Sequence, residues 1–431
     1  MFALKKRIPA FYFLLMLVLL TPCPAHAVVK TPAAPPKPSV ASKAKTGPKK
    51  ARKKDTAAWD QRMRGLYVTL TRLLAEVSSD SQFNDPANFK RIEADAKLLS
   101  ELVHDLSAIT RDEKTATGER MLSPDTDPSI LLMTSLFSED TKRAYEALKT
   151  GHRDYARVVL RTVTGYCIGC HTRSTPAQAT RPQEPETPEI KSLSQIERAE
   201  FLASTLQNDA ALEEFEKIIS DPKIRKERQL AWEKTVRYAL AIAVRVKRDP
   251  ARAIKIVDAV LGAGDAPEFL KEDAELWKAS IAAWRAETAR TLTSEDALYA
   301  ETVRLITQAR MLQKYPADHA ADVLYLRVSA TVHDLLRIAP NGRYSADALF
   351  LLGLSYEALR DMNLWSLHEM SYEACIRKSP HTETAKNCYS HYEETIYAGY
   401  SGSGGVSIPK VVAAKLDELE KLSIPQGTKV Q

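Results

Sequence analysis

The chain has 431 residues with few glycines and few cysteines, and its first 54 residues contain no acid at all. Its 15 glycines against 23 prolines, with few β-branched runs, exclude a collagen-like fibre and favour an all-α fold. With 44% hydrophobic and 27% charged residues, it is neither a disordered chain nor a multi-span membrane protein. The whole chain carries +6, and twelve Lys and Arg lie in residues 1–54, so residues 55–431 carry −6. Such an acidic body gives no support to nucleic-acid binding.

The N-terminal segment has the three parts of a secretory signal peptide. Residues 5–7 are basic, residues 11–20 are apolar but too short to span a membrane comfortably, and residues 25–27 read Ala-His-Ala. We therefore predict a signal peptide over residues 1–27, cleaved after Ala27. The mature chain is expected in the periplasm without stable membrane insertion. Lipid attachment at Cys23 is a weaker alternative, because proline precedes this cysteine where a small residue is expected.

Two proline-rich segments divide the mature chain. Residues 28–54 combine five prolines with nine Lys and Arg, which predicts a disordered basic tether. Residues 174–190 contain four prolines among Thr, Gln and Glu, which predicts a linker between domains. The predicted domains therefore span residues 55–173 and 191–425.

A Cys-x-x-Cys-His motif lies at the end of the first predicted domain. It consists of Cys167, Cys170 and His171 and is the attachment signature of c-type haem. Cysteines three residues apart share one helical face and can form two thioethers, while the following imidazole reaches the iron. We predict one covalently attached haem c, with His171 as the proximal iron ligand. A thioredoxin-like redox pair is the alternative, but that motif follows a strand, and nothing upstream of Cys167 has the pattern of a strand.

The other two cysteines of the mature chain, Cys375 and Cys388, are 13 residues apart on either side of a Lys-Ser-Pro-His turn. Two antiparallel helices joined at that turn would bring both residues to the same level. In an oxidising compartment this arrangement predicts a disulfide that pins the hairpin. The alternative is a second redox centre.

Four amphipathic helical segments are expected between residues 57 and 173. In the first segment, apolar residues spaced three and four residues apart form one stripe along the helix over residues 59–77. The second and third each begin with Asp-Pro, at Asp85 and Asp127, and the third ends near Gly151. The fourth leads from His152 into the Cys-x-x-Cys-His motif. Four such helices suggest an antiparallel bundle.

This stretch resembles the class II c-type cytochromes, the four-helix-bundle group that includes cytochrome c prime. The resemblance rests on the motif at the end of the fourth helix and on Met63, on the buried face of the first. It implies a haem inside the bundle, with His171 as proximal ligand and Met63 as candidate distal ligand. Members usually have an arginine four residues after the motif histidine, where this chain has Thr175. Many bundle cytochromes dimerise, so the resemblance also allows a homodimer.

The distal ligand has alternatives that the pattern leaves open. Met63 lies near the centre of its apolar stripe, so its side chain is expected to point inward. Met133 on the third helix is a rival, and an open five-coordinate iron is the main alternative. His104 and His152 are both expected at the surface.

The second predicted domain, residues 191–425, has a helical period almost throughout. One stretch is similar to the tetratricopeptide pattern, in which a glycine allows two helices to pack closely before a terminal proline. Its residues are Leu349, Leu352, Gly353, Tyr356, Tyr372, Cys375 and Pro380. We predict an irregular α-solenoid, a class of structure that usually binds protein or peptide. The alternative is a plain helical body.

The function these patterns favour is a periplasmic monohaem c-type cytochrome that carries single electrons, with the helical-repeat domain docking a redox or other protein partner. A haem-based gas sensor with an open distal site is the first alternative. A protein-interaction scaffold with a non-redox haem is the second. We do not expect an enzyme, because the sequence lacks a second haem motif and an evident distal acid-base residue.

Overall fold

The computed structural model describes residues 52–110, 128–172, 187–287, 291–316, 318–359 and 367–425. The predicted signal peptide, most of the predicted tether and linker residues 174–186 lie outside these ranges. Contacts divide the chain into two units, residues 1–48 and 49–431, and all described residues belong to the second. The described residues form helices with one short two-stranded sheet, so the predicted all-α class is confirmed.

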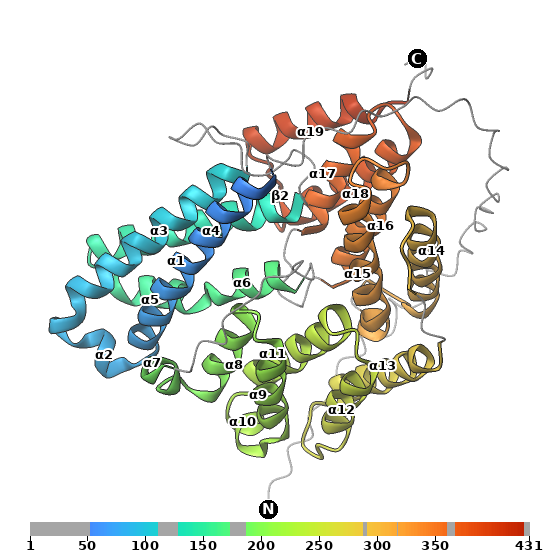
Figure 1. The fold of residues 1–431 in the computed structure, drawn as a ribbon. Coiled ribbons are helices and arrows are strands. Elements are labelled where there is room, and N and C mark those ends of the chain that lie inside the picture. Colours follow the sequence, from blue (N-terminus) through green and yellow to red (C-terminus); the bar gives the residue numbers. More distant parts are fainter. Residues whose placement is uncertain are drawn as a thin grey trace, which may run out of the picture. The chain divides into compact units, whose positions relative to one another are not determined.

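The helices up to the Cys-x-x-Cys-His motif pack side by side, as Figure 1 shows. Helix α1 contacts α3, α3 contacts α4, α4 contacts α5, and α5 contacts α1. Their bounds are α1 (Arg52–Ser78), α2 (Asp80–Asn84), the 3₁₀ helix η1 (Pro86–Asn88), α3 (Phe89–Thr110), α4 (Pro128–Lys149), α5 (Arg153–Thr162) and α6 (Thr164–His171). The predicted fourth helix is thus divided into α5 and α6 at Val163.

The apolar stripes of these helices meet in one core, which we call the N-terminal core. Its members include Leu70, Leu99, Phe137 and Leu160, each at most 6% exposed. Two of the three predicted helix boundaries, at Asp85 and near Gly151, lie within the described residues. Asp85 accepts a hydrogen bond from the Ala87 amide at 2.9 Å ahead of η1. Helix α4 ends at Lys149, and Gly151 follows two residues later with a φ of +83° that suits glycine. Asp127 lies outside the described residues.

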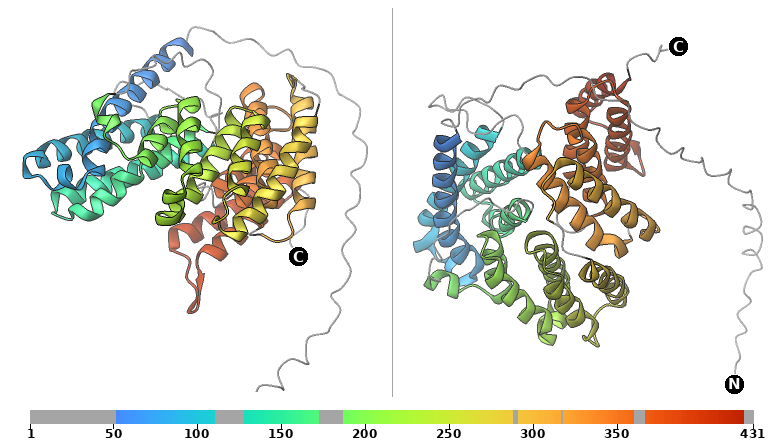
Figure 2. Two further views of the ribbon diagram at one scale, coloured as in Figure 1. Left: turned by 90° about the horizontal axis from the view of Figure 1, so that it is seen from below. Right: turned by 45° about the vertical axis from the view of Figure 1, so that its right-hand side comes forward.

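The remaining chain continues as helices that pack on their neighbours in sequence (Figure 2). Helix α9 contacts α8, α11 and α12, α12 contacts α13, and from α14 to α19 each helix contacts the next. The bounds are α7 (Pro188–Lys191), α8 (Gln195–Ser204), α9 (Asn208–Ser220), α10 (Pro222–Glu227), α11 (Gln229–Ala241), the π-helix η2 (Ile242–Val246), α12 (Pro250–Leu261), α13 (Glu268–Ala286), α14 (Glu295–Leu312), the 3₁₀ helix η3 (His319–Ala321), α15 (Asp322–Ile338), α16 (Ser345–Ala358), α17 (Leu367–Lys378), α18 (Glu383–Gly399), β1 (Ser401–Gly402), β2 (Gly405–Val406) and α19 (Lys410–Ser423).

The helices before and after the predicted linker share apolar cores. Ile190 of α7, at the end of the predicted linker, and Phe201 of α8 belong to the N-terminal core. Conversely, Met133 of α4 and Ile168 of α6 belong to the core that fills residues 196–367, which we call the central core. The two predicted domains are therefore in direct contact in this unit. The four-helix-bundle and solenoid architectures, and the division into domains, stay predictions.

The close helix pair expected from the tetratricopeptide-like pattern is α16 with α17. Gly353 lies on α16 against the ring of Tyr372 on α17, and a Cβ at this glycine would lie 2.5 Å from Tyr372 Cδ1. Only a residue without a Cβ allows the two helices to approach this closely. The predicted role of Gly353 in close packing is thus present in the structure.

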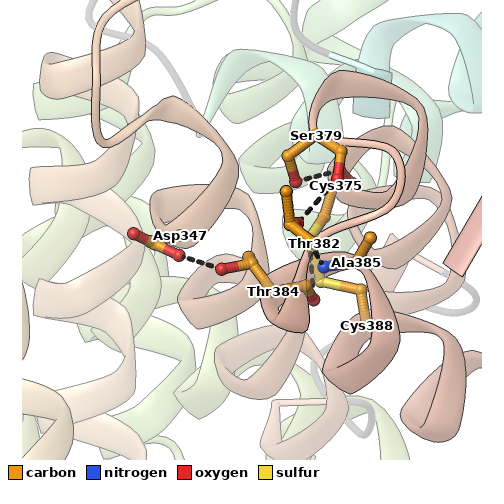
Figure 3. The surroundings of a disulfide bond; sticks show 7 residues. All are labelled: Asp347, Cys375, Ser379, Thr382, Thr384, Ala385 and Cys388. Atoms are coloured by element: carbon orange, nitrogen blue, oxygen red, sulfur yellow. Dashed lines mark hydrogen bonds between the residues drawn. A yellow bond between two sulfur atoms is a disulfide. The ribbon is translucent and has the colours of Figure 1, made fainter. Parts of the chain in front are cut away.

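The predicted disulfide joins Cys375 of α17 to Cys388 of α18, with a Cα–Cα distance of 6.3 Å. Figure 3 shows that it lies beside the turn between the two helices, where the Thr382 hydroxyl accepts a hydrogen bond from the Ala385 amide at 3.1 Å. Thr384 ties this turn to α16 by donating a hydrogen bond to Asp347 at 2.7 Å. The bridge therefore pins α17 to α18, as the sequence predicted.

A half-buried carboxylate on α13, Asp273, lies in a charged cluster between helices. Arg237 of α11 contacts it at 3.9 Å and contacts Asp322 of α15 at 3.3 Å. His319 lies 3.2 Å from Asp322. Burial raises the pKa of the Asp273 carboxyl from 3.8 to about 6, a shift that the nearby His319 and Arg237 reduce and that the negative charges of Asp322 and Asp318 reinforce.

We expect this cluster to make stability pH-dependent. Because the folded state binds the Asp273 proton more tightly than the unfolded state, the free energy of unfolding should fall by about 3 kcal/mol as pH rises from about 3 to about 7. Asp273→Asn should remove this component, whereas Glu275→Gln, at an exposed position of the same helix, should keep it. Denaturant titrations of the three proteins across this range provide the measurement. Parallel pH profiles for wild type and Asp273→Asn would contradict the assignment.

Candidate haem attachment site

The motif cysteines lie on a short helix that continues the direction of the one before it. Val163, between α5 and α6, keeps right-handed helical angles, with φ −62° and ψ −25°. Cys167 and Cys170 are three residues apart on α6, so they share one face of the helix. His171 is the last residue of α6, and the next residue, Thr172, closes the helix by donating its hydroxyl to the Ile168 carbonyl at 2.8 Å.

Each cysteine faces a different core. Cys167 packs against the N-terminal core, and its thiol points at the Val163 carbonyl at 3.9 Å. Cys170 packs against the central core, and its sulfur lies 3.6 Å from the sulfur of Met133 on α4. Neither cysteine takes part in a disulfide. The motif therefore lies where the two cores meet.

The environment of Cys167 does not favour thiol–disulfide chemistry. Burial, reinforced by the neighbouring Cys170, raises the pKa of the Cys167 thiol to about 12. A disulfide oxidoreductase needs the opposite shift, because its attacking species is the thiolate. The motif also follows helix α5 and not a strand. Both observations disfavour the thioredoxin-like alternative.

The imidazole of His171 is held by the backbone of another helix. Its Nδ1 lies 2.6 Å from the carbonyl oxygen of Ser204, at the C terminus of α8. A carbonyl oxygen can only accept, so Nδ1 carries the proton and donates it to this bond. In a neutral ring Nε2 is then the basic nitrogen, the form in which histidine binds metals, and a carbonyl on the opposite nitrogen is a common arrangement around metal-bound histidine.

The two candidate methionines are both on the inner side of their helices. Met63 is half-buried on α1 and packs against the N-terminal core, as expected from its position in the stripe. Met133 is 6% exposed, and its sulfur contacts that of the motif residue Cys170. Whether either of them ligates iron stays a prediction. His104 and His152 are exposed, as predicted.

An aromatic pair supports the motif from the side of α4. Phe137 stacks on Tyr166 with ring centroids 5.3 Å apart and an interplanar angle of 18°. Tyr166 also donates its hydroxyl to Asp140, and burial together with this hydrogen bond raises the pKa of the phenol. These contacts hold the residue directly before Cys167 in one orientation. Sequence reasoning missed Asp140 and Ser204, because neither has a spacing that connects it with the motif.

The donor set fits a covalently attached haem. It offers two thiols on one helical face, an imidazole with Nδ1 engaged by a carbonyl, and the thioether side chains of Met63 and Met133 in apolar surroundings. Within the described residues, no group of three or more His, Cys, Asp and Glu side chains could hold a bare metal ion.

Comparison with models of protein families, with curated proteins and with solved structures found no match to this chain. The search for membrane spans covered the described residues and found no helix with the length and apolar character to cross a bilayer.

Proposed function

We propose that this chain is a periplasmic monohaem c-type cytochrome that carries single electrons and docks a redox or other protein partner through its helical-repeat region. The observation that carries the proposal is the Cys-x-x-Cys-His motif with the His171 Nδ1 bound to a backbone carbonyl at 2.6 Å. The bound haem would supply reversible one-electron iron chemistry. The ring of contacts among α1, α3, α4 and α5 supports the resemblance to class II c-type cytochromes.

In this proposal the protein binds the haem and surrounds it with apolar side chains. Cys167 and Cys170 anchor the cofactor, and His171 supplies its imidazole from the end of α6. The N-terminal and central cores surround the half-buried motif with apolar side chains, and an apolar environment favours the less charged ferrous form and so raises the reduction potential. In this proposal no acid–base residue takes part.

Export is supported by two independent features. The first 27 residues have the parts of a signal peptide. The disulfide between Cys375 and Cys388 is typical of proteins that fold in an oxidising compartment. Covalent haem attachment through Cys167 and Cys170 would take place in the same compartment.

The test is the optical spectrum of the exported chain made with haem-maturation machinery, in the ferric and ferrous states, with and without carbon monoxide. We expect reversible reduction and a low-spin ferrous form that resists carbon monoxide in wild type and in Met133→Ala. Met63→Ala should bind carbon monoxide. If Met133→Ala is the variant that binds it, the distal ligand is Met133 and the carrier proposal stands.

Other spectra would favour the alternatives. A high-spin wild type that binds carbon monoxide readily would replace the carrier with a gas-binding sensor. A covalent haem that is not reduced reversibly would favour a scaffold with a non-redox haem. A chain without covalent haem would overturn the proposal and both alternatives.

A further inference from the structure

The last four carbonyl groups of α8 all accept hydrogen bonds from outside the helix. The last carbonyls of a helix lack partners within the helix and need others. The Phe201 carbonyl accepts the Thr205 amide at 3.0 Å, the Leu202 carbonyl accepts the Gln207 amide at 2.9 Å, and the Ala203 carbonyl accepts the Leu206 amide at 3.2 Å. The next carbonyl, that of Ser204, accepts the imidazole Nδ1–H of His171.

A backbone strain accompanies this arrangement. Leu206 has φ of +61°, in the left-handed region that glycine usually occupies at the end of a helix. This turn lets the amides of Leu206 and Gln207 donate hydrogen bonds to the carbonyls of Ala203 and Leu202. The Ser204 side chain is also satisfied locally, because its hydroxyl donates to the Phe201 carbonyl at 2.8 Å. The contact with His171 is thus made by the backbone of α8 alone.

Helix α8 is itself anchored to the helices around the motif. Glu197 near its N terminus pairs with Arg161 of α5 at 2.7 Å. Phe201, 1% exposed, lies in the N-terminal core with its ring 5.8 Å from that of Tyr67 on α1. On its other side, Arg198 pairs with Glu214 of α9 at 2.7 Å. The Ser204 carbonyl is therefore placed by contacts that connect the motif to the following helices.

We propose that the Ser204 carbonyl is the positioning group of the haem site: it orients the His171 imidazole, selects its Nδ1–H tautomer and strengthens its donation to iron. This inference rests on the proposed function. The negative end of the α8 dipole lies at this carbonyl, which makes it a strong acceptor. An imidazole that donates a strong hydrogen bond through Nδ1 is a better ligand through Nε2, which stabilises ferric iron and lowers the reduction potential.

The consequence is that the helical-repeat region is part of the redox site. Because α8 contacts α9 and is paired with it through Arg198 and Glu214, a partner that shifts these helices would change the hydrogen bond and with it the potential. The repeat region would then tune electron transfer and not only dock the partner.

The variant that tests this is Thr205→Pro, with Thr205→Ala as its matched control. Proline disfavours helical angles in the residue before it, so it turns the Ser204 carbonyl away from His171. Alanine removes the Thr205 hydroxyl, which bonds the Phe201 and Leu202 carbonyls, but leaves the Ser204 carbonyl in place. With haem loaded, we expect a higher midpoint potential in Thr205→Pro and the wild-type potential in Thr205→Ala.

A second measurement needs neither haem nor the proline variant. In the full mature chain without haem, ¹⁵N spectra of the imidazole should show His171 as the Nδ1–H tautomer, whereas free histidine favours the other. A wild-type Nε2–H tautomer, or equal potentials in Thr205→Pro and Thr205→Ala, would overturn the inference. If Thr205→Pro does not fold, the tautomer of His171 in the wild type decides whether the inference holds. A wild type that never binds haem would overturn the proposed function, and the tautomer would still report separately on the hydrogen bond.

Discussion

Gly353→Ala is expected to destabilise the protein by about 3 kcal/mol, although alanine is the better helix former. Helix propensity alone would stabilise α16 by about 1 kcal/mol. The new methyl group, however, would overlap the Tyr372 ring. Moving the Tyr372 ring would cost free energy, because the Tyr372 hydroxyl donates to Glu357 at 2.6 Å and the ring lies 5.3 Å from that of His391. The steric cost should therefore exceed the gain in propensity.

The matched control is Gly399→Ala, at the last residue of α18, where an added Cβ meets nothing within 4 Å. It should leave the free energy of unfolding unchanged or raise it slightly. The double variant Gly353→Ala/Tyr372→Leu should cost less than the sum of its two single variants, because the smaller side chain relieves the overlap. Denaturant unfolding of all four variants gives these values. A neutral Gly353→Ala would show that α16 and α17 separate easily.

The sequence predicted the local features of this chain well. The apolar stripe of α1 places Leu70, Leu73 and Val77 in the core, each at most 4% exposed. The spacing of Cys375 and Cys388 around a turn predicted their disulfide. Patterns of this kind are visible in sequence because the residues that carry them are close along the chain or repeat with a helical period.

What the sequence could not show are contacts between distant segments. Nothing in the spacing connects His171 with Ser204, 33 residues later, since the partner is a backbone carbonyl that every residue has. Asp140 is likewise one of many carboxylates, and only the packing of α4 on α6 places it at Tyr166. The proline-rich stretch over residues 174–190 suggested independent domains, yet Ile190 and Phe201 fill the N-terminal core. These outcomes depend on tertiary packing, which periodicity does not encode.

The two pairs of cysteines therefore differ in more than spacing, and the difference can be measured. Cys375 and Cys388 are bonded to each other, whereas Cys167 and Cys170 lie on one face of α6 without a disulfide. If the second pair attaches haem, it should leave the protein with a permanent mass increase of one haem. If it is a redox pair, it should instead cycle between thiols and a disulfide.

We expect Cys167→Ala/Cys170→Ala to abolish covalent haem in the exported chain, so that acidified organic solvent extracts all of the pigment. Each single variant should keep one thioether and a reduced yield, because either cysteine can still react alone. Cys375→Ser/Cys388→Ser is the matched control, since it removes the same number of cysteines and should retain one covalent haem per chain. Intact mass and the pyridine haemochrome spectrum provide the readout. Haem that resists extraction from the Cys167→Ala/Cys170→Ala protein would mean that attachment does not use this motif, and the role assigned to His171 would fall with it.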